Sequence, residues 1–313
     1  MADLRWGLTL PFAGVRLADH GPLLQRAEAA GYDDVWSGET ANGYDGFTPL
    51  ALAAAHTERL RLVTGIVNPF TRGPGVLAQT AAALQDASGG RFVLGLGASS
   101  DVIVERFNGL EFSKPLSKVR EAVERLRPVL SVPAERGFGG LKLESPVQTP
   151  VPIVLAALRE RMLRLATEVA DGAFTNFLPI SGAEQVAGIA REAGDVELAC
   201  RFFLIPQPAD EGMGFARFMF AAYGSVPVYA EFFRWLGWAE QLEPMVEAWN
   251  AGDRALASER APEELIREIF VFGSPEEQRA RLDEYVAAGI TTPVLTPICG
   301  PEELPGLIDA LAR

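Results

Sequence analysis

The chain has few of the residues that bind transition metals or serve serine hydrolases. Its 313 residues include only two histidines, His20 and His56, and two cysteines, Cys200 and Cys299. These four are too far apart in sequence to predict a metal site. We expect the thiols to be small core residues of a cytoplasmic protein and the histidines to be structural or solvent-facing. With no Gly-x-Ser-x-Gly motif and no plausible histidine partner, a serine hydrolase is also disfavoured.

Positive charge and long hydrophobic runs are also scarce. The chain carries 28 lysines and arginines against 41 aspartates and glutamates, which gives a formal net charge of −13. Nucleic acids and anionic membranes attract basic surfaces, so we expect the protein to bind neither. No window approaches the roughly 20 apolar residues of a membrane span, and the first residues lack the pattern of a secretory signal. These observations predict a soluble protein.

What the chain does contain is a steady alternation of short apolar strands and helices. Residues 61–101 show it best. A short apolar run ends at Asn68-Pro69, a helix is expected over 73–87, and Gly89-Gly90 separates it from a second strand over 91–96. Two apolar strands joined by a helix predict a parallel crossover unit, in which ligands bind at the carboxyl ends of the strands.

This alternation extends over nearly the whole chain and predicts one domain, residues 1–313. The strands are expected at 6–10, 34–37, 62–67, 91–96, 153–156, 172–176, 196–205 and 293–296. Eight strands with intervening helices favour a closed α/β structure, the (β/α)8 or TIM barrel, over an open sheet. An aromatic-rich helical insertion is expected at about 207–262, before the last strand. Its aromatic side chains either attach extra helices to the barrel or cover a pocket or dimer interface.

Four segments, taken in order, resemble the luciferase-like monooxygenase superfamily, and within it the coenzyme F420-dependent oxidoreductases. They are TGIVNPFTRGP, SGGRFVLGLG, FNGLEFSKPLSKVREAV and LRERMLRLATEVADGAFTN. The resemblance implies a bacterial luciferase-like TIM barrel that transfers a hydride between the deazaflavin F420 and a small organic substrate. It also implies a homodimer, with an F420 or flavin reductase as a possible redox partner. The alternatives are an FMN-dependent monooxygenase supplied with reduced flavin by a partner reductase, and a non-catalytic flavin-binding protein.

The resemblance places the cofactor ring against the third strand. In the family a bulge with a cis peptide lies behind the ring, and the matching pair here is Gly65-Ile66. Asn68 can donate and accept in one plane, as the edge of a pyrimidine-like ring requires, or it can be a turn residue before Pro69. The resemblance also points to the residues after the fourth strand as a lining of the cofactor channel, namely Gly97, Ala98 and Ser99.

A helix start directly after the fifth strand is the expected phosphate site. Its free amides favour an anion, and Arg159 or Arg161 can add a charge-assisted contact. Family members often have Gly-Pro where this chain has Arg159-Glu160, so the carboxylate of Glu160 departs from the pattern. Glu160 can instead be a first-turn acid that interacts with the helix dipole. Thr175 and Asn176, at the end of the sixth strand, are further candidates for contacts with the phosphate or the cofactor side chain.

Glu39, in the segment WSGET, is the expected catalytic residue. It follows the second strand, at a position where many relatives of this family carry a histidine beside the ring. A carboxylic acid there can relay a proton or hydrogen-bond the deazaflavin, provided that burial raises its pKa. The alternative is a loop carboxylate that faces water.

Overall fold

A closed ring of eight parallel strands forms the centre of the computed structural model, which describes residues 3–40, 43–192 and 194–313. The ring runs from β1 through β2, β3, β4, β5, β6, β7 and β9 and back to β1, so the predicted TIM barrel is confirmed. The strands are β1 (Gly7–Leu10), β2 (Asp34–Ser37), β3 (Arg61–Thr64), β4 (Phe92–Leu96), β5 (Ile153–Ala156), β6 (Gly172–Asn176), β7 (Glu197–Ile205) and β9 (Thr292–Pro297).

One additional strand, β8 (Val271–Phe272), lies outside the ring. It pairs with the carboxyl end of β7, where Leu204 and Ile205 are its partners. The sequence did not predict β8, because two residues are too short for a recognisable strand pattern.

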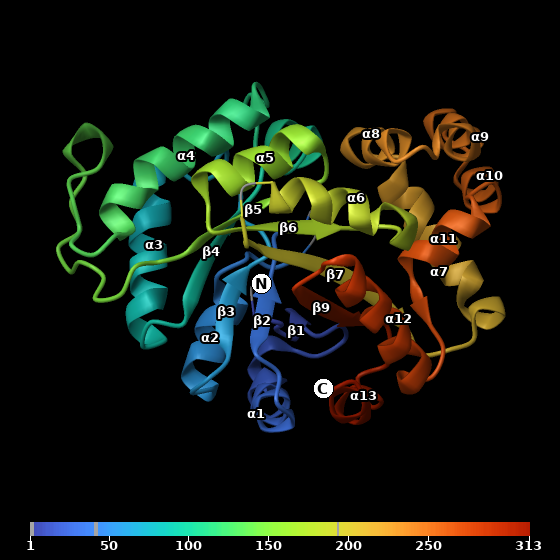
Figure 1. The fold of residues 1–313 in the computed structure, drawn as a ribbon, viewed down its shortest axis with the longest axis horizontal. Coiled ribbons are helices and arrows are strands. Elements are labelled where there is room, and N and C mark those ends of the chain that lie inside the picture. The colour runs from blue at the N-terminus through green and yellow to red at the C-terminus, as the bar shows by residue number, and fades with distance from the viewer. Residues whose placement is uncertain (1–2, 41–42, 193) are drawn as a thin grey trace.

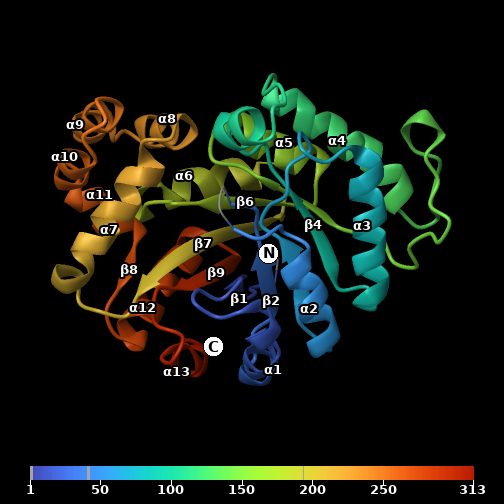
Figure 2. The same ribbon diagram turned by 180° about the vertical axis from the view of Figure 1, so that it is seen from behind.

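In the part of the chain that the structure describes, helices surround the barrel on all sides (Figures 1 and 2). They are α1 (His20–Ala30), α2 (Thr48–His56), α3 (Pro74–Ala87), α4 (Pro115–Leu130), α5 (Glu160–Val169), α6 (Ile180–Arg191), α12 (Pro275–Ala288) and α13 (Leu304–Ala310). Local sequence sets several of their ends. Gly31 ends α1 in the left-handed conformation at φ 97°, and Ser274 and Glu277 form a capping box at the start of α12.

The helical insertion gathers at one end of the molecule, opposite the long loop that follows α4 (Figures 1 and 2). It comprises α7 (Ala209–Gly224), α8 (Pro227–Trp235), α9 (Ala239–Asn250), α10 (Arg254–Glu259) and α11 (Glu263–Ile269). The predicted end at residue 262 was wrong, because Pro262 is the N-cap of α11 and begins a further helix instead of ending the insertion.

Aromatic residues of the insertion serve more than one purpose. Phe220, Phe232 and Phe233 are fully buried and pack against one another, so they attach the helices to each other. Phe215 and Phe218 on α7 are instead exposed.

The barrel interior is layered from its amino-terminal end upward. The lowest layer is an ion cluster in which Arg61 of β3 bonds Asp34 of β2 at 2.7 Å and Glu197 of β7 at 2.8 Å. Because β3 and β7 are not neighbours in the ring, the Arg61–Glu197 contact crosses the barrel. Above this cluster lies an apolar layer formed by Trp36, Val63, Val93, Val154, Phe174, Ala199 and Val294.

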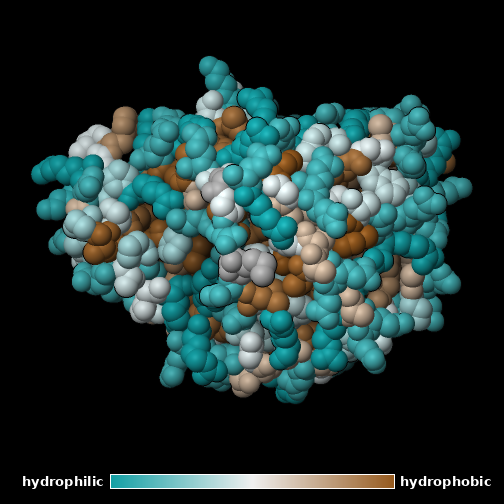
Figure 3. All heavy atoms as spheres, viewed as in Figure 1, coloured by the Kyte–Doolittle hydropathy of each residue, from teal (hydrophilic) through white to brown (hydrophobic). Residues whose placement is uncertain are grey.

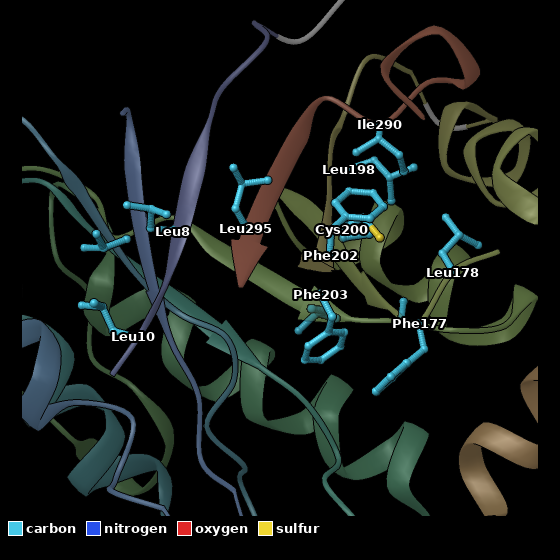
Figure 4. Packing of buried hydrophobic residues seen from close by; sticks show 14 of the residues in the cluster. Leu8, Leu10, Phe177, Leu178, Leu198, Cys200, Phe202, Phe203, Ile290 and Leu295 are labelled. Atoms are coloured by element: carbon cyan, nitrogen blue, oxygen red, sulfur yellow. The ribbon is translucent and has the colours of Figure 1, made fainter. Parts of the chain in front are cut away.

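The outward-facing residues of the strands pack against the helices. Figure 4 shows Leu198, Cys200 and Phe202 together, with Phe203 apart from them and beside Phe177. This is the alternation expected along a strand whose Ala199 belongs to the apolar layer inside the barrel. Burial raises the pKa of the Cys200 thiol and suits its predicted place in the core.

The face shown in Figure 3 carries mostly hydrophilic side chains, with hydrophobic ones in small separate areas. Among the described residues, no helix combines the length and apolar character needed to cross a bilayer.

Candidate active site

Small residues line the carboxyl ends of β2, β3 and β4. A Cβ atom on Gly38 would lie 2.2 Å from the carbonyl oxygen of Gly65, and one on Gly95 would lie 1.7 Å from that of Thr64. On Gly97 it would lie 2.8 Å from side-chain atoms of both Ile66 and Ala156. At Gly38 and Gly95 the neighbouring backbone leaves room only for glycine, and at Gly97 the neighbouring side chains crowd any added Cβ. These glycines, together with Gly65, form a surface without large side chains at one side of the barrel mouth, which we call the floor.

A bulge interrupts β3 within this floor. The Gly65–Ile66 peptide is cis, as the family resemblance implied. The Thr64 hydroxyl bonds both the amide and the carbonyl of Gly95, at 2.6 and 2.9 Å, and the ladder with β4 resumes only at Val67. The Ile66 side chain packs on the apolar layer. The bulge therefore presents Ile66 at the barrel mouth.

Asn68 follows the bulge and is 1% exposed. Its Oδ1 accepts from the amides of Phe70 and Thr71, at 3.2 and 2.9 Å, and from the Thr71 hydroxyl. The Oδ1 atom therefore makes the local hydrogen bonds of a turn residue, as the alternative interpretation of Asn68 predicted. Its Nδ2 has no protein partner in the described part of the chain and remains a donor for a ligand.

Glu39 pairs with an arginine from the next loop. The Arg72 Nε and Nη2 atoms both donate to Glu39 Oε1, at 3.1 and 2.5 Å, and the Glu39 side chain is 15% exposed. The predicted alternative of a fully solvated loop carboxylate does not describe it. Because both donors bond Oε1, Oε2 is left without a protein partner among the described residues. Arg72 also lies over the Phe47 ring at 5.1 Å, which joins the loops that follow β2 and β3.

The residues after β4 form an irregular segment at the same mouth. Gly97 donates its amide to the Val67 carbonyl, and Ser99 adopts a left-handed conformation at φ 65°. Ala98 packs against the surrounding core. The chain then enters a π-helical turn, Val102–Phe107, a form that often accompanies functional sites.

The start of α5 has the geometry that the sequence predicted. Arg159 is the N-cap, with extended backbone and no side-chain cap, so first-turn amides remain available. The Arg159 guanidinium lies 3.5 Å from Glu231 of α8, and Glu160 pairs with Arg164 one turn along α5 at 3.0 Å. Arg161 is exposed. Because Glu160 pairs along its own helix, its charge is partly neutralised at the expected phosphate site.

Thr175 and Asn176 point to opposite faces of β6. Phe174 belongs to the apolar layer inside the barrel, so the strand alternation turns Thr175 outward and Asn176 inward. The Thr175 hydroxyl is buried without a partner on the outer face, and we leave Thr175 out of the proposed cofactor site. Asn176 accepts from Arg201 Nε at 3.3 Å and donates to the Tyr229 hydroxyl at 3.0 Å. Its amide oxygen and nitrogen therefore each have one protein partner.

Sequence reasoning missed two arginines at this mouth, Arg72 and Arg201. Arg72 lies within TRGP, the end of a segment that carried the family resemblance, and its pairing with Glu39 depends on loop geometry that no local pattern specifies. Arg201 interrupts the apolar run of β7 at an inward-facing position. A charged residue in such a run was the available signal.

Comparisons with known proteins agree with this architecture. Residues 7–292 match the family model described as luciferase-like monooxygenase. The putative coenzyme F420-dependent oxidoreductase Rv3520c of Mycobacterium tuberculosis is 28% identical, with 94% of this chain and 95% of the relative covered. The 5,10-methylenetetrahydromethanopterin reductase of Archaeoglobus fulgidus is 29% identical, covering 88% and 89%.

Solved structures extend the likeness to the fold. The coenzyme F420-dependent tetrahydromethanopterin reductase from Methanopyrus kandleri aligns with a TM-score of 0.78 at 25% identity, covering 100% of this chain and 98% of that one. An F420-dependent secondary alcohol dehydrogenase in complex with an F420–acetone adduct aligns with a TM-score of 0.76 at 18% identity, covering 99% and 100%. At that identity the second likeness concerns the fold alone. The family model spans nearly the whole chain, and the protein belongs to the luciferase-like monooxygenase family.

Proposed function

We propose that the protein is an F420-dependent oxidoreductase that transfers a hydride between the deazaflavin and a small organic substrate. Its support is the bulge at Gly65-Ile66 on a floor of small residues, together with relatives described as F420-dependent. The bulge is the single observation on which the proposal depends most.

The residues at the mouth fit a flat tricyclic ring. Gly38, Gly65 and Gly97 keep the floor low, and Ile66 supplies an apolar surface against which one face of the ring packs. Asn68 Nδ2 is a donor for the ring edge. Ala98 and Ser99 line the channel beside it. These assignments keep the cofactor at the carboxyl ends of β2 to β4.

The phosphate of the cofactor is assigned to the start of α5. The amides of Glu160 and Arg161 belong to the first turn, where a helix leaves its N–H groups unpaired. Arg161 or Arg159 adds a positive charge, and the pairing of Glu160 with Arg164 lessens the repulsion from its carboxylate.

The bound deazaflavin would supply the hydride chemistry, and the protein would supply orientation, a dry floor and proton handling. The apolar layer beneath the mouth keeps water from reaching the ring from the barrel interior. We assign proton transfer to Glu39. Its Oε1 atom accepts hydrogen bonds from Arg72, and its Oε2 atom is left to accept a proton from the substrate oxygen or return one to it.

FMN is the alternative cofactor, in a monooxygenase that receives reduced flavin from a partner reductase. It is favoured by the description of the matched family model and by the fold similarity to an FMN-bound Baeyer–Villiger monooxygenase constituent from Pseudomonas putida, with a TM-score of 0.67. The assigned floor and phosphate site would accept either ring system. A non-catalytic flavin-binding protein is the remaining alternative.

The proposal includes a cytoplasmic homodimer, with a separate F420 or flavin reductase as a redox partner. The exposed Phe215 and Phe218 on α7 are candidates for the dimer contact, because aromatic residues are favoured at such interfaces.

The test compares turnover with the two reduced cofactors. Reduced F420 is incubated anaerobically with a panel of carbonyl and unsaturated compounds, and oxygen uptake is measured separately with reduced FMN and the same panel. The proposal expects F420 oxidation that depends on both protein and substrate without oxygen. Substrate-dependent oxygen uptake with FMN alone would favour the monooxygenase, and binding without turnover would favour the carrier protein.

A further inference from the structure

We propose that Arg201 binds an anionic group of the substrate, so that the substrate is a small organic acid, either a carboxylate or a phosphate ester. The inference rests on the proposed function for the reaction at the neighbouring ring. The binding step itself depends only on the residues around Arg201.

Arg201 projects into the barrel just above the apolar layer. It is in register with Asn176 of β6, and the pair one level below is Phe174 and Ala199, which both belong to that layer. Side chains two positions apart on a strand share a face. Arg201 and Asn176 therefore face the mouth on the side formed by β6 and β7, across from the small residues of β2 to β4.

Neighbouring groups hold the guanidinium in place but use only one of its donors. Nε donates to Asn176 Oδ1 at 3.3 Å, and the guanidinium lies over the Phe203 ring at 5.1 Å. Asn176 is itself fixed by donating to the Tyr229 hydroxyl. A guanidinium has five N–H donors in a planar fork suited to carboxylate or phosphate. The four donors on Nη1 and Nη2 have no protein acceptor in the described ranges.

The charge of Arg201 has no carboxylate partner among the described residues. The interior carboxylates, Asp34 and Glu197, lie below the apolar layer and are paired with Arg5 and Arg61. A partly buried charge without a counter-ion is costly, and an anionic ligand would offset that cost. The contrast with the fully paired ion cluster at the other end of the barrel indicates that Arg201 is kept for a ligand.

Tyr229 provides a second donor beside Arg201. Its hydroxyl accepts from Asn176, and its own proton has no protein acceptor in the described part of the chain. Burial raises the pKa of Tyr229 despite the charge of Arg201, so the phenol stays protonated. The ring centroid of Phe177 lies 4.7 Å from that of Phe203 and 5.3 Å from that of Tyr229, and these contacts hold Tyr229 in place beside Arg201.

The test measures binding of two anions and one neutral analogue by calorimetry. Crotonate, inorganic phosphate and crotonamide are titrated into the protein with and without oxidised F420. The variants are Arg201→Gln, Arg201→Lys and Tyr229→Phe. Arg279→Gln is the matched control, because Arg279 is exposed on α12 and its substitution removes the same charge. Thermal melting verifies that each variant is folded.

The proposal expects at least one anion to bind the F420-loaded protein saturably. Arg201→Gln should weaken that binding at least tenfold, with a smaller loss for Arg201→Lys and Tyr229→Phe and none for Arg279→Gln. Crotonamide should bind the wild type and Arg201→Gln equally. The proposal is overturned if neither anion binds, or if Arg201→Gln binds the anion as tightly as the wild type does. It is also overturned if F420 competes with the anion and the Arg201→Gln variant binds F420 more weakly than the wild type does. The last result would assign Arg201 to the cofactor.

Failure of the proposed function gives a different result. If F420 does not bind, yet an anion binds the cofactor-free protein in an Arg201-dependent way, the oxidoreductase proposal fails and the anion site stands.

Discussion

The backbone of Gly38 packs directly against the backbone of Gly65, and a Cβ atom on Gly38 would lie 2.2 Å from the Gly65 carbonyl oxygen. The ends of β2 and β3 are thereby locked at the point where the bulge presents Ile66 to the barrel mouth. The geometry of the proposed ring site depends on this close approach more than on any single polar contact.

Gly38→Ala should displace the bulge. The added methyl group cannot fit against the Gly65 carbonyl, so we expect a lower melting temperature and a loss of F420 affinity of about tenfold or more, which is about 1.4 kcal/mol. Gly75→Ala is the matched control, since Gly75 lies in α3 with no atom within 4 Å of the added Cβ. Unchanged F420 binding by a folded Gly38→Ala variant would show that the floor does not shape the site.

Glu39→Gln tests the assigned proton role. Glutamine keeps the shape and can still accept from Arg72, but it cannot carry the proton, so we expect kcat to fall roughly 10²-fold. The dissociation constant of F420 should stay within about twofold, because the substitution leaves the size of the side chain unchanged. Stopped-flow kinetics and a fluorescence titration would measure the two effects. A kcat equal to that of the wild type would reduce Glu39 to a residue that positions Arg72.

Arg161→Glu tests the phosphate site at the start of α5. Reversing this charge beside the first-turn amides should weaken F420 binding about tenfold, the size of one charge-assisted contact. A deazaflavin that lacks the phosphate should bind the variant and the wild type alike. Equal weakening of both ligands would place the phosphate elsewhere.

Glu197→Gln tests the ion cluster below the apolar layer. Burial alone would raise the pKa of Glu197, but the hydrogen bond and charge of Arg61 outweigh it and hold this pKa below its ordinary value. Losing the charged contact should lower the free energy of unfolding by about 1.5–3 kcal/mol at pH 7.

The pH dependence of that loss has a definite sign. Because the pKa of Glu197 is lower in the folded state, its stabilisation is complete above the unfolded value and disappears as the pH falls through the folded value. The difference between wild type and Glu197→Gln should thus be constant near neutrality and shrink below about pH 4.5. Glu168→Gln, at an exposed pair with Arg120, should have no measurable effect. Urea unfolding across this range would check both, and a gap that widened in acid would contradict the assignment.

Much of the fold was predictable because periodicity and breakers mark its elements. β2, β5 and β6 begin and end at the predicted residues, each bounded by proline, glycine or a change of pattern. The bulge at Gly65-Ile66 came from the family resemblance, since nothing in the local pattern distinguishes a bulged glycine from an ordinary core one. The insertion was predicted to end too early, at Pro262, because proline occurs both after helix ends and at helix starts.

The site was less predictable because its contacts join distant segments. Sequence indicated Glu39 and Asn176, but their partners Arg72 and Arg201 are brought to them only when the barrel closes. Thr175 faces outward because its neighbour Phe174 faces the barrel interior. The sequence alone did not show which of the two side chains faces inward.

The most direct test of the account is a titration of the purified protein with F420 and, separately, with FMN. Binding is read from the fluorescence of the five tryptophans. Trp36 is the best placed reporter, because its ring lies 3.0 Å from where a Cβ on Gly65 would be, directly under the proposed floor. The account predicts saturable quenching by F420 at lower concentrations than by FMN, weakened in Gly38→Ala. Tighter binding of FMN, or binding of neither, would contradict it.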